Sequence, residues 1–196
     1  MRPDADSTGD TMKDLMTYVK VYNDWFSKGE CKKKVTELKK SKWEQHTFAT
    51  YDESNLNISG DKELNTSYCD DFDNQYVMQR LWDGYYRYVE DLGLPYFNSW
   101  AGFSQVRYNR YQPGQTMALH CDHIRTLFDG QRRGIPILSA VGLLNDNYKG
   151  GEFIMWDEEI KLKAGDLLVF PSVFMFPHLV KPVKSGTRYS LVSWSW

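Results

Sequence analysis

The chain has 196 residues, 41% of them hydrophobic and 26% charged, with a formal net charge of −2. This length and apolar content suit one globular domain with a buried core, and they exclude collagen-like, low-complexity and disordered classes. A near-neutral charge gives no field strong enough to hold a polyanion or a membrane surface, so we expect neither nucleic acid nor a membrane as a partner.

The cysteines and the first residues bear on the cellular compartment. Cys31, Cys69 and Cys121 are widely spaced and lack a zinc-binding pattern, so we expect free thiols. The polar, acidic start, MRPDADSTGD, lacks the basic patch and apolar run of a signal peptide. The longest apolar stretch, 167–177, is too short to cross a bilayer. These features together predict a cytoplasmic protein, or one in the host cytoplasm if the source is a virus.

Two segments in the first half have the apolar spacing of amphipathic helices. Residues 12–26 place apolar side chains at steps of three and four, behind a capping-box-like start at Thr11 and Asp14. Residues 74–92 repeat this spacing and end at Gly93. We therefore predict a helix in each segment, with the aromatic stripe of the second helix in the core.

Two polar stretches lie between these predicted helices. Residues 31–42 carry six lysines, which is typical of a solvated helix face, with a patch for an acidic partner as the alternative. Residues 50–67 are rich in turn-forming residues and show no periodicity, which predicts a long surface loop.

The character of the chain changes after Pro95. Short β-rich runs follow one another, separated by turn signals such as Gly150-Gly151 and Ser185-Gly186. We therefore predict a mainly β fold with N-terminal helices. In one integrated domain, a helical support and loop region, 1–97, would pack on one sheet of an antiparallel double sheet, 98–196.

The segment His120-Cys121-Asp122 is a candidate metal-binding motif. On a strand, His120 and Asp122 share a face while Cys121 points to the other side, so one imidazole and one carboxylate can bind the same ion. His178 is a candidate third ligand, since it follows an apolar strand and a proline-containing corner. Two histidines and one carboxylate form the facial triad of non-haem iron(II), which leaves coordination positions open. The alternative reading makes His178 an ordinary core or surface histidine.

Arg188 lies ten residues beyond His178, in a predicted strand. Alternation places it on the same face as Ser190, Val192 and Trp194. An arginine inside a small barrel is costly unless it is paired, and a guanidinium binds carboxylates through two parallel hydrogen bonds. Arg188 is therefore expected to hold either a bound carboxylate or the side chain of an Asp or Glu.

This constellation, together with Tyr111, resembles the 2-oxoglutarate and iron(II)-dependent oxygenases, specifically the prolyl 4-hydroxylase branch with its small bacterial and viral relatives. The resemblance covers roughly residues 98–196. Its motifs in this sequence are RYQPGQTMALHCDH, GGEF, GDLLVFPS, FPHLVKPV and GTRYSLVSW.

The resemblance implies a double-stranded β-helix, or jelly roll, and a set of residue roles. His120, Asp122 and His178 would bind Fe(II), and Arg188 would bind the C5 carboxylate of 2-oxoglutarate, with Tyr111 nearby. The implied activity is hydroxylation of a C–H bond by O2, with release of succinate and CO2 and with ascorbate as reductant.

Two positions depart from the family pattern. Many members carry a tyrosine where this chain has Met117, and some carry a co-substrate-binding tyrosine where it has Leu143. Hydrogen bonds to the C5 carboxylate must then come from elsewhere, with Tyr111, Ser139 or water as the candidates.

The resemblance also bears on the substrate. Nucleic-acid demethylases of this class usually have a second arginine where this chain has Trp194, whereas prolyl hydroxylases have a tryptophan, so a peptide or protein substrate is favoured. Arg107, Asn109 and Tyr111 share one strand face, and we expect Arg107, Asn109 and Trp194 to bind the substrate. A small molecule or nucleobase is the alternative substrate, and a non-enzymatic jelly-roll binding module is the alternative function.

Segments 50–67 and 123–134 are candidates to cover the mouth of the site and select the substrate. Arg125, Arg132 and Arg133 in the second segment would either meet an acidic peptide or serve solubility.

Overall fold

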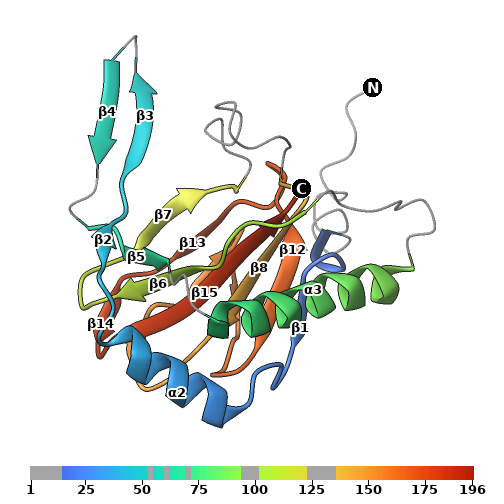
Figure 1. The fold of residues 1–196 in the computed structure, drawn as a ribbon. Helices are drawn as coiled ribbons and strands as arrows, with labels where there is room; N and C mark the ends of the chain where they lie inside the picture. The colour runs from blue at the N-terminus through green and yellow to red at the C-terminus, as the bar shows by residue number, and fades with distance from the viewer. Residues whose placement is uncertain (1–14, 53–54, 60–61, 69–71, 94–101, 123–135) are drawn as a thin grey trace, which may run out of the picture.

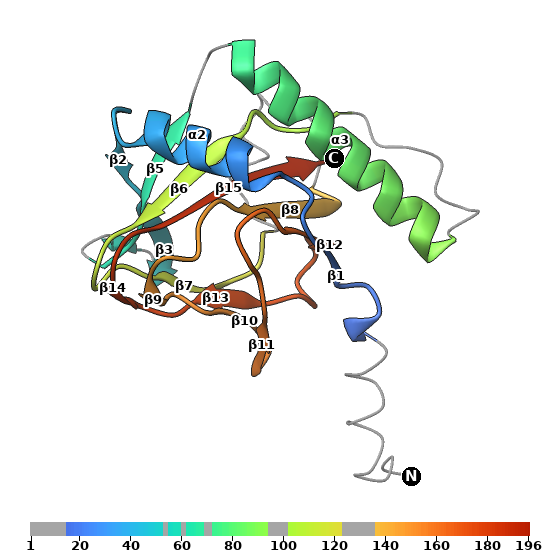
Figure 2. The ribbon, with the colours of Figure 1, turned by 90° about the horizontal axis from the view of Figure 1, so that it is seen from below.

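The fold consists of two facing antiparallel sheets, with helices on the outer side of the larger sheet (Figure 1, Figure 2). The computed structural model describes residues 15–52, 55–59, 62–68, 72–93, 102–122 and 136–196. Within these ranges no helix is both long enough and apolar enough to span a bilayer. Segment 123–134, considered above as a cover for the site, lies outside the described residues.

The strands form two main sheets and two small pairs. The larger sheet has the order β1 (Lys20–Tyr22), β12 (Leu167–Pro171), β8 (Leu138–Leu143), β15 (Arg188–Ser195), β6 (Arg107–Tyr111), β5 (Asn65–Tyr68) and β2 (Glu44–Gln45). The smaller sheet has the order β11 (Glu158–Ile160), β10 (Phe153–Met155), β13 (His178–Val180) and β7 (Met117–His120). The small pairs are β14 (Val183–Ser185) with β9 (Lys149–Gly150), and β3 (Phe48–Asp52) with β4 (Asn55–Ser59).

Strand alternation divides the core into two layers. On β15, Tyr189 and Leu191 point outward and join a cluster with the helices, whereas Val192 points inward and joins the cluster between the two sheets. β12 divides in the same way, with Val169 outward and Phe170 inward. The predicted alternation of β15 is therefore confirmed, and the inner face of the large sheet is turned toward the smaller one.

Two helices, α2 (Lys28–Leu38) and α3 (Phe72–Leu92), cover the outer face of the large sheet, as Figure 2 shows. A capping box starts α2, because Ser27 Oγ accepts from the Glu30 N–H while the Glu30 carboxylate accepts from the Ser27 N–H. The helix predicted over 74–92 is found as α3. A Cβ on Gly84 of α3 would lie 2.5 Å from Leu167 Cδ2, so the lack of a side chain there permits the close approach of helix and sheet.

The helix predicted over 12–26 is wrong for most of its described residues. A short helical turn at Leu15 and Met16 is followed by β1, which pairs with β12 at the edge of the large sheet. Val19 and Val21 pack into the core between the sheets, and β-branched residues favour such a strand. The capping residues Thr11 and Asp14 lie outside the described residues.

The loop predicted over 50–67 is also wrong. β3 and β4 form a hairpin that projects from the body of the molecule (Figure 1), and β5 joins the large sheet between β2 and β6. Leu56 and Ile58 alternate with polar residues in β4, which is the period-two pattern of a strand. The region before residue 98 thus contributes β1, β2 and β5 to the large sheet in addition to the helices.

Candidate metal and co-substrate site

Three potential metal ligands converge at one edge of the smaller sheet. His120 ends β7 and His178 begins β13, and the two residues are direct partners in the antiparallel register. Asp122 follows two residues after His120. Its Oδ1 lies 3.3 Å from His120 Nε2 and 3.8 Å from His178 Nε2, and the three ligand atoms all lie within 4.8 Å of one another. The structure therefore brings together the three predicted ligands.

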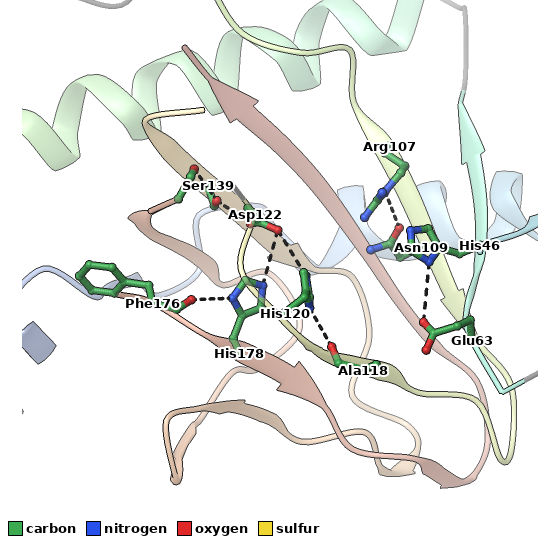
Figure 3. A network of polar contacts seen from close by, with 11 residues as sticks. His46, Glu63, Arg107, Asn109, Ala118, His120, Asp122, Ser139, Phe176 and His178 are labelled. Atoms are coloured by element: carbon green, nitrogen blue, oxygen red, sulfur yellow. Dashed lines mark hydrogen bonds and ion pairs between the residues drawn. The ribbon is translucent and has the colours of Figure 1, made fainter. Parts of the chain in front are cut away.

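Backbone carbonyls orient both imidazoles, as Figure 3 shows. His120 Nδ1 lies 2.8 Å from the Ala118 carbonyl oxygen, and His178 Nδ1 lies 3.1 Å from that of Phe176. A carbonyl oxygen can only accept, so each Nδ1–H donates to its carbonyl, and each Nε2 faces Asp122 on the side where a metal would bind. This arrangement is typical of histidines that ligate a metal.

The carboxylate of Asp122 is held from the other side by serines. Ser139 Oγ donates to Asp122 Oδ2 at 2.6 Å and lies 2.8 Å from Ser172 Oγ. Ser139 was expected to bind the co-substrate, and its described side-chain contacts are with Asp122 and Ser172. This places its hydroxyl behind the carboxylate, where it fixes the orientation of one ligand.

The electrostatics of the site favour the protonation states that a metal requires. Burial by itself raises the pKa of Asp122, but His178, His120 and the Ser139 hydrogen bond outweigh it and hold that pKa well below its usual value. Burial lowers the pKa of His178, although Asp122 opposes the shift. An anionic carboxylate beside a neutral imidazole suits a divalent cation. The donor set therefore fits Fe(II).

Arg188 lies in the same cavity as the triad. Its side chain is 1% exposed, Nη1 donates to Ser190 Oγ at 2.9 Å, and the guanidinium lies 4.9 Å from the centre of the Tyr111 ring. No carboxylate among the described residues pairs with it, and its Nε has no hydrogen-bond partner there. The Asp or Glu partner considered from the sequence is therefore not found in the described part of the chain. A buried, unpaired guanidinium is costly, so the cavity suits a ligand with a carboxylate.

Tyr111 and the two departures from the family pattern lie close to Arg188. Tyr111 is buried in the cavity wall, and burial raises the pKa of its hydroxyl, with Arg188 and Arg107 opposing the shift. Met117 also lines the cavity, and Leu143 faces Ser190 across the β8–β15 pairing. A neutral phenol is a hydrogen-bond donor, so Tyr111 is the tyrosine available to a carboxylate in this cavity.

The three predicted substrate-binding residues line the same cavity. Arg107 Nε donates to Asn109 Oδ1 at 3.1 Å, and the Arg107 guanidinium lies 4.8 Å from the centre of the Trp194 ring. Arg107 and Asn109 come from β6 and Trp194 comes from β15, which are neighbours in the large sheet.

Two residues near this site were not predicted. His46 and Glu63 lie beside Asn109 in Figure 3, with His46 Nδ1 3.7 Å from Glu63 Oε2. Burial, with the charges of Arg107 and His120, lowers the pKa of His46 to about 4, and burial raises the pKa of Glu63. Both residues lie in polar stretches far from the motifs, and no sequence signal pairs them with the site.

Comparisons with known proteins agree with this geometry. Residues 106–196 match the family model of the 2OG-Fe(II) oxygenase superfamily. A PKHD-type hydroxylase of Shewanella sp. (strain MR-7) is 42% identical over 94 residues, covering 44% of this chain and 40% of the relative. One of Stenotrophomonas maltophilia (strain R551-3) is 38% identical over 94 residues, covering 45% and 41%. The matches thus span less than half the length of these curated relatives.

Solved structures share the fold over most of the chain. A viral collagen prolyl hydroxylase from Paramecium Bursaria Chlorella virus-1, in complex with 2-oxoglutarate, has a TM-score of 0.61 at 18% identity and covers 91% of this chain and 94% of its own. A prolyl hydroxylase from Trichoplax adhaerens, in complex with a peptide fragment of the hypoxia inducible factor oxygen degradation domain, has a TM-score of 0.69 at 16% identity and covers 96% and 93%. At these identities the likeness shows that the chain shares the fold of these structures, which is a jelly roll.

The class is indicated by three agreeing observations: residues 106–196 match the 2OG-Fe(II) oxygenase superfamily, they contain the three clustered ligands, and the chain shares the fold of the solved structures. The relatives it resembles in sequence are PKHD-type hydroxylases, and solved structures that share its fold are prolyl hydroxylases. The resemblance predicted from the motifs is confirmed.

Proposed function

We propose that this protein is an Fe(II)- and 2-oxoglutarate-dependent dioxygenase that hydroxylates a prolyl residue in a peptide or protein. One observation carries the proposal: His120, Asp122 and His178 converge in the same cavity as the buried, unpaired Arg188. Three ligands for a metal and a receptor for a carboxylate are what a chelating 2-oxo acid requires. When bound, Fe(II), 2-oxoglutarate and O2 would supply the oxidation of a C–H bond, and 2-oxoglutarate would be converted to succinate and CO2.

The residues of this chain position the reactants. His120, Asp122 and His178 would hold the metal, with Ser139 fixing the Asp122 carboxylate through their 2.6 Å hydrogen bond. Arg188 would bind the C5 carboxylate of 2-oxoglutarate, with the neutral hydroxyl of Tyr111 as a second donor.

Arg107, Asn109 and Trp194 would bind the substrate, since they line the cavity from the neighbouring strands β6 and β15. A peptide substrate is supported by the solved structures, one of which is a collagen prolyl hydroxylase and another of which was determined with a peptide.

Succinate formation tests this function. Wild type and His178→Ala are incubated with 2-oxoglutarate, Fe(II) and ascorbate, with and without a proline-rich peptide library. Peptide-stimulated succinate that depends on His178, together with a proline product heavier by one oxygen atom, supports a prolyl hydroxylase. Basal turnover that no peptide stimulates moves the substrate to small molecules or nucleobases. Bound iron without any turnover supports the binding-module alternative.

We also propose that the chain forms one integrated domain and that it is located in the cytoplasm. The sheet that joins strands from before and after residue 98 supports one integrated domain. The free thiols of Cys31 and Cys121 support a reducing, cytoplasmic location.

A further inference from the structure

A second arginine in the cavity has no assigned anionic partner. Arg107 and Arg188 both line the cavity that contains the triad. No carboxylate in the described part of the chain forms an ion pair with Arg107. Arg188 is 1% exposed, whereas Arg107 is half-buried, so Arg107 is the more accessible of the two guanidiniums. In the proposed function the C5 carboxylate of 2-oxoglutarate pairs with Arg188, so Arg107 is left to bind another ligand.

The contacts of Arg107 leave its terminal amino groups free to bind. The Arg107 Cζ lies over the Trp194 ring, 4.8 Å from its centre, and Nε donates to Asn109 Oδ1 at 3.1 Å. These contacts hold the guanidinium in place at the cavity wall and use one of its five N–H groups. The remaining four belong to the two terminal nitrogens, which form a planar fork that matches the two oxygens of a carboxylate.

The balance of charge on the cavity wall favours an anion. Among the lining residues in the described ranges, two guanidiniums accompany the single carboxylate of Asp122. A divalent metal and the 2-oxoglutarate dianion cancel each other's formal charge, and Asp122 balances one guanidinium. One positive charge then remains, and in a partly buried cavity it attracts an anionic ligand more strongly than it would in water.

The titratable residues nearest to this subsite do not remove that charge. Glu63 is 6% exposed, and its Oε2 lies 3.7 Å from His46 Nδ1 rather than within ion-pair distance of Arg107. Figure 3 shows the Glu63 carboxylate directed toward His46, with Asn109 and Arg107 beyond it. Asn109 and Tyr111 line the same cavity wall, so the Arg107 subsite adjoins the wall around Arg188.

We propose that Arg107 is the receptor for a carboxylate of the substrate, so that the enzyme selects substrates with a carboxylate close to the carbon that is hydroxylated. This inference rests on the proposed function and narrows its substrate class. The carboxylate has two possible sources: an acidic side chain next to the reacting residue of a peptide, or the α-carboxylate of a free amino acid. His46 and Glu63, which lie near this subsite, belong to segments outside the family match at 106–196.

Calorimetric binding under anaerobic conditions tests the inference without turnover. The protein is loaded with Fe(II) and 2-oxoglutarate and titrated with two matched pairs of probes. The first pair is an end-blocked hexapeptide with Glu beside its proline, before or after it, and the same peptide with Gln. The second pair is L-proline and L-prolinamide. We expect the acid of one pair to bind about 10- to 100-fold more tightly than its neutral twin, as expected for hydrogen bonds to a charged group. The pair that discriminates identifies the source of the carboxylate.

Variants assign the discrimination to Arg107. Arg107→Gln should bind the acid and its neutral twin within about twofold of each other. Arg107→Lys keeps the charge but loses the planar fork, so it should retain a reduced preference. This variant is also the one to use if Arg107→Gln does not fold. Arg110→Gln is the matched control, because Arg110 lies on the same strand but contacts Trp43 and Asn65 outside the cavity. It should bind as wild type does.

Three results would overturn the inference. One is a wild type that treats acid and neutral twins alike in both pairs, which includes binding neither. Another is full discrimination in both Arg107 variants. The third is a loss of 2-oxoglutarate affinity in Arg107→Gln of about tenfold or more, which would assign Arg107 to the co-substrate instead. The proposed function fails separately, by the absence of iron-dependent succinate from wild type with any substrate.

Discussion

The guanidinium of Arg188 is almost fully buried, yet its contacts in the described residues are a serine hydroxyl and the face of a tyrosine ring. Such a group is stable in the folded protein when a bound anion completes its coordination. We expect Arg188→Ala to weaken 2-oxoglutarate binding by about 2 to 5 kcal/mol, because one partner of a buried charge pair is lost. The dissociation constant for 2-oxoglutarate measures this effect. An unchanged constant would remove Arg188 from the co-substrate site.

His46 makes stability depend on pH. Its pKa is lowered to about 4, mainly by burial, whereas in the unfolded chain it titrates near 6.5. Between these values the unfolded state binds more protons than the folded state, so the free energy of unfolding should fall as the pH decreases from 6.5 to 4. After allowance for solvent screening, the loss due to His46 is about 1 to 2 kcal/mol. Urea unfolding at pH 7.0 and at about pH 4.5 should show a smaller decrease for His46→Gln than for wild type. Equal decreases would contradict the burial of this imidazole.

The sequence was sufficient to predict the chemistry of the site at the level of single residues. His120 and Asp122 are two residues apart, as the predicted alternation requires, although β7 ends at His120. Arg188 shares a strand face with Ser190 and Val192, so alternation along β15 directs it into the cavity. The contacts of Ser139 with Asp122 and of His46 with Glu63 join residues 17 apart in each case. Such contacts depend on how strands pair and loops return, which no local pattern specifies.

At the scale of elements, the packing of α3 on the large sheet depends on Gly84. A Cβ at this position would lie 2.5 Å from Leu167 Cδ2, and Leu167 is fully buried in β12. We expect Gly84→Ala to destabilise the protein by about 1 to 3 kcal/mol, because the overlap outweighs the gain in helix propensity. Gly29→Ala in α2 is the control, since its Cβ would meet nothing closer than 3.9 Å. That change should be neutral or stabilising by up to about 1 kcal/mol. Equal effects of the two changes, measured by urea unfolding, would contradict the close packing of α3.

The elements that sequence patterns predicted wrongly are those whose signals were ambiguous. Residues 19–22 satisfy both a helical spacing and a β-branched strand, and pairing with β12 decides for the strand. In β4 the alternation of Leu56 and Ile58 is short and lies among asparagines and serines. By contrast, α3 is long and strongly periodic, and its local pattern agrees with its packing.

At the scale of the whole molecule, the site joins the two sheets. The metal ligands come from β7, from β13 and from Asp122, two residues after the end of β7, whereas the two arginines come from the inner face of the large sheet. A metal bound by the triad would tie β7 to β13, so it should stabilise the folded state by mass action, by about 2.7 kcal/mol at a free metal concentration 100 times its Kd. We expect Co(II), used in place of iron to prevent oxidation, to raise the Tm of wild type.

The same measurement has an internal control. His178→Ala removes one ligand, and its Tm should respond little to Co(II); a chelator should return wild type to its metal-free Tm. An equal rise in wild type and in His178→Ala would mean that the metal binds elsewhere on the protein.

The measurement that most directly tests the central claim, that the triad and Arg188 form one catalytic site, is the Fe(II)-dependent conversion of 2-oxoglutarate to succinate and CO2. It compares wild type with Asp122→Ala and Arg188→Ala, at a low and at a saturating concentration of 2-oxoglutarate. The structure predicts turnover by wild type, none by Asp122→Ala at either concentration, and activity in Arg188→Ala that recovers as 2-oxoglutarate is raised. Turnover by Asp122→Ala at the wild-type rate would contradict the assignment of the metal site.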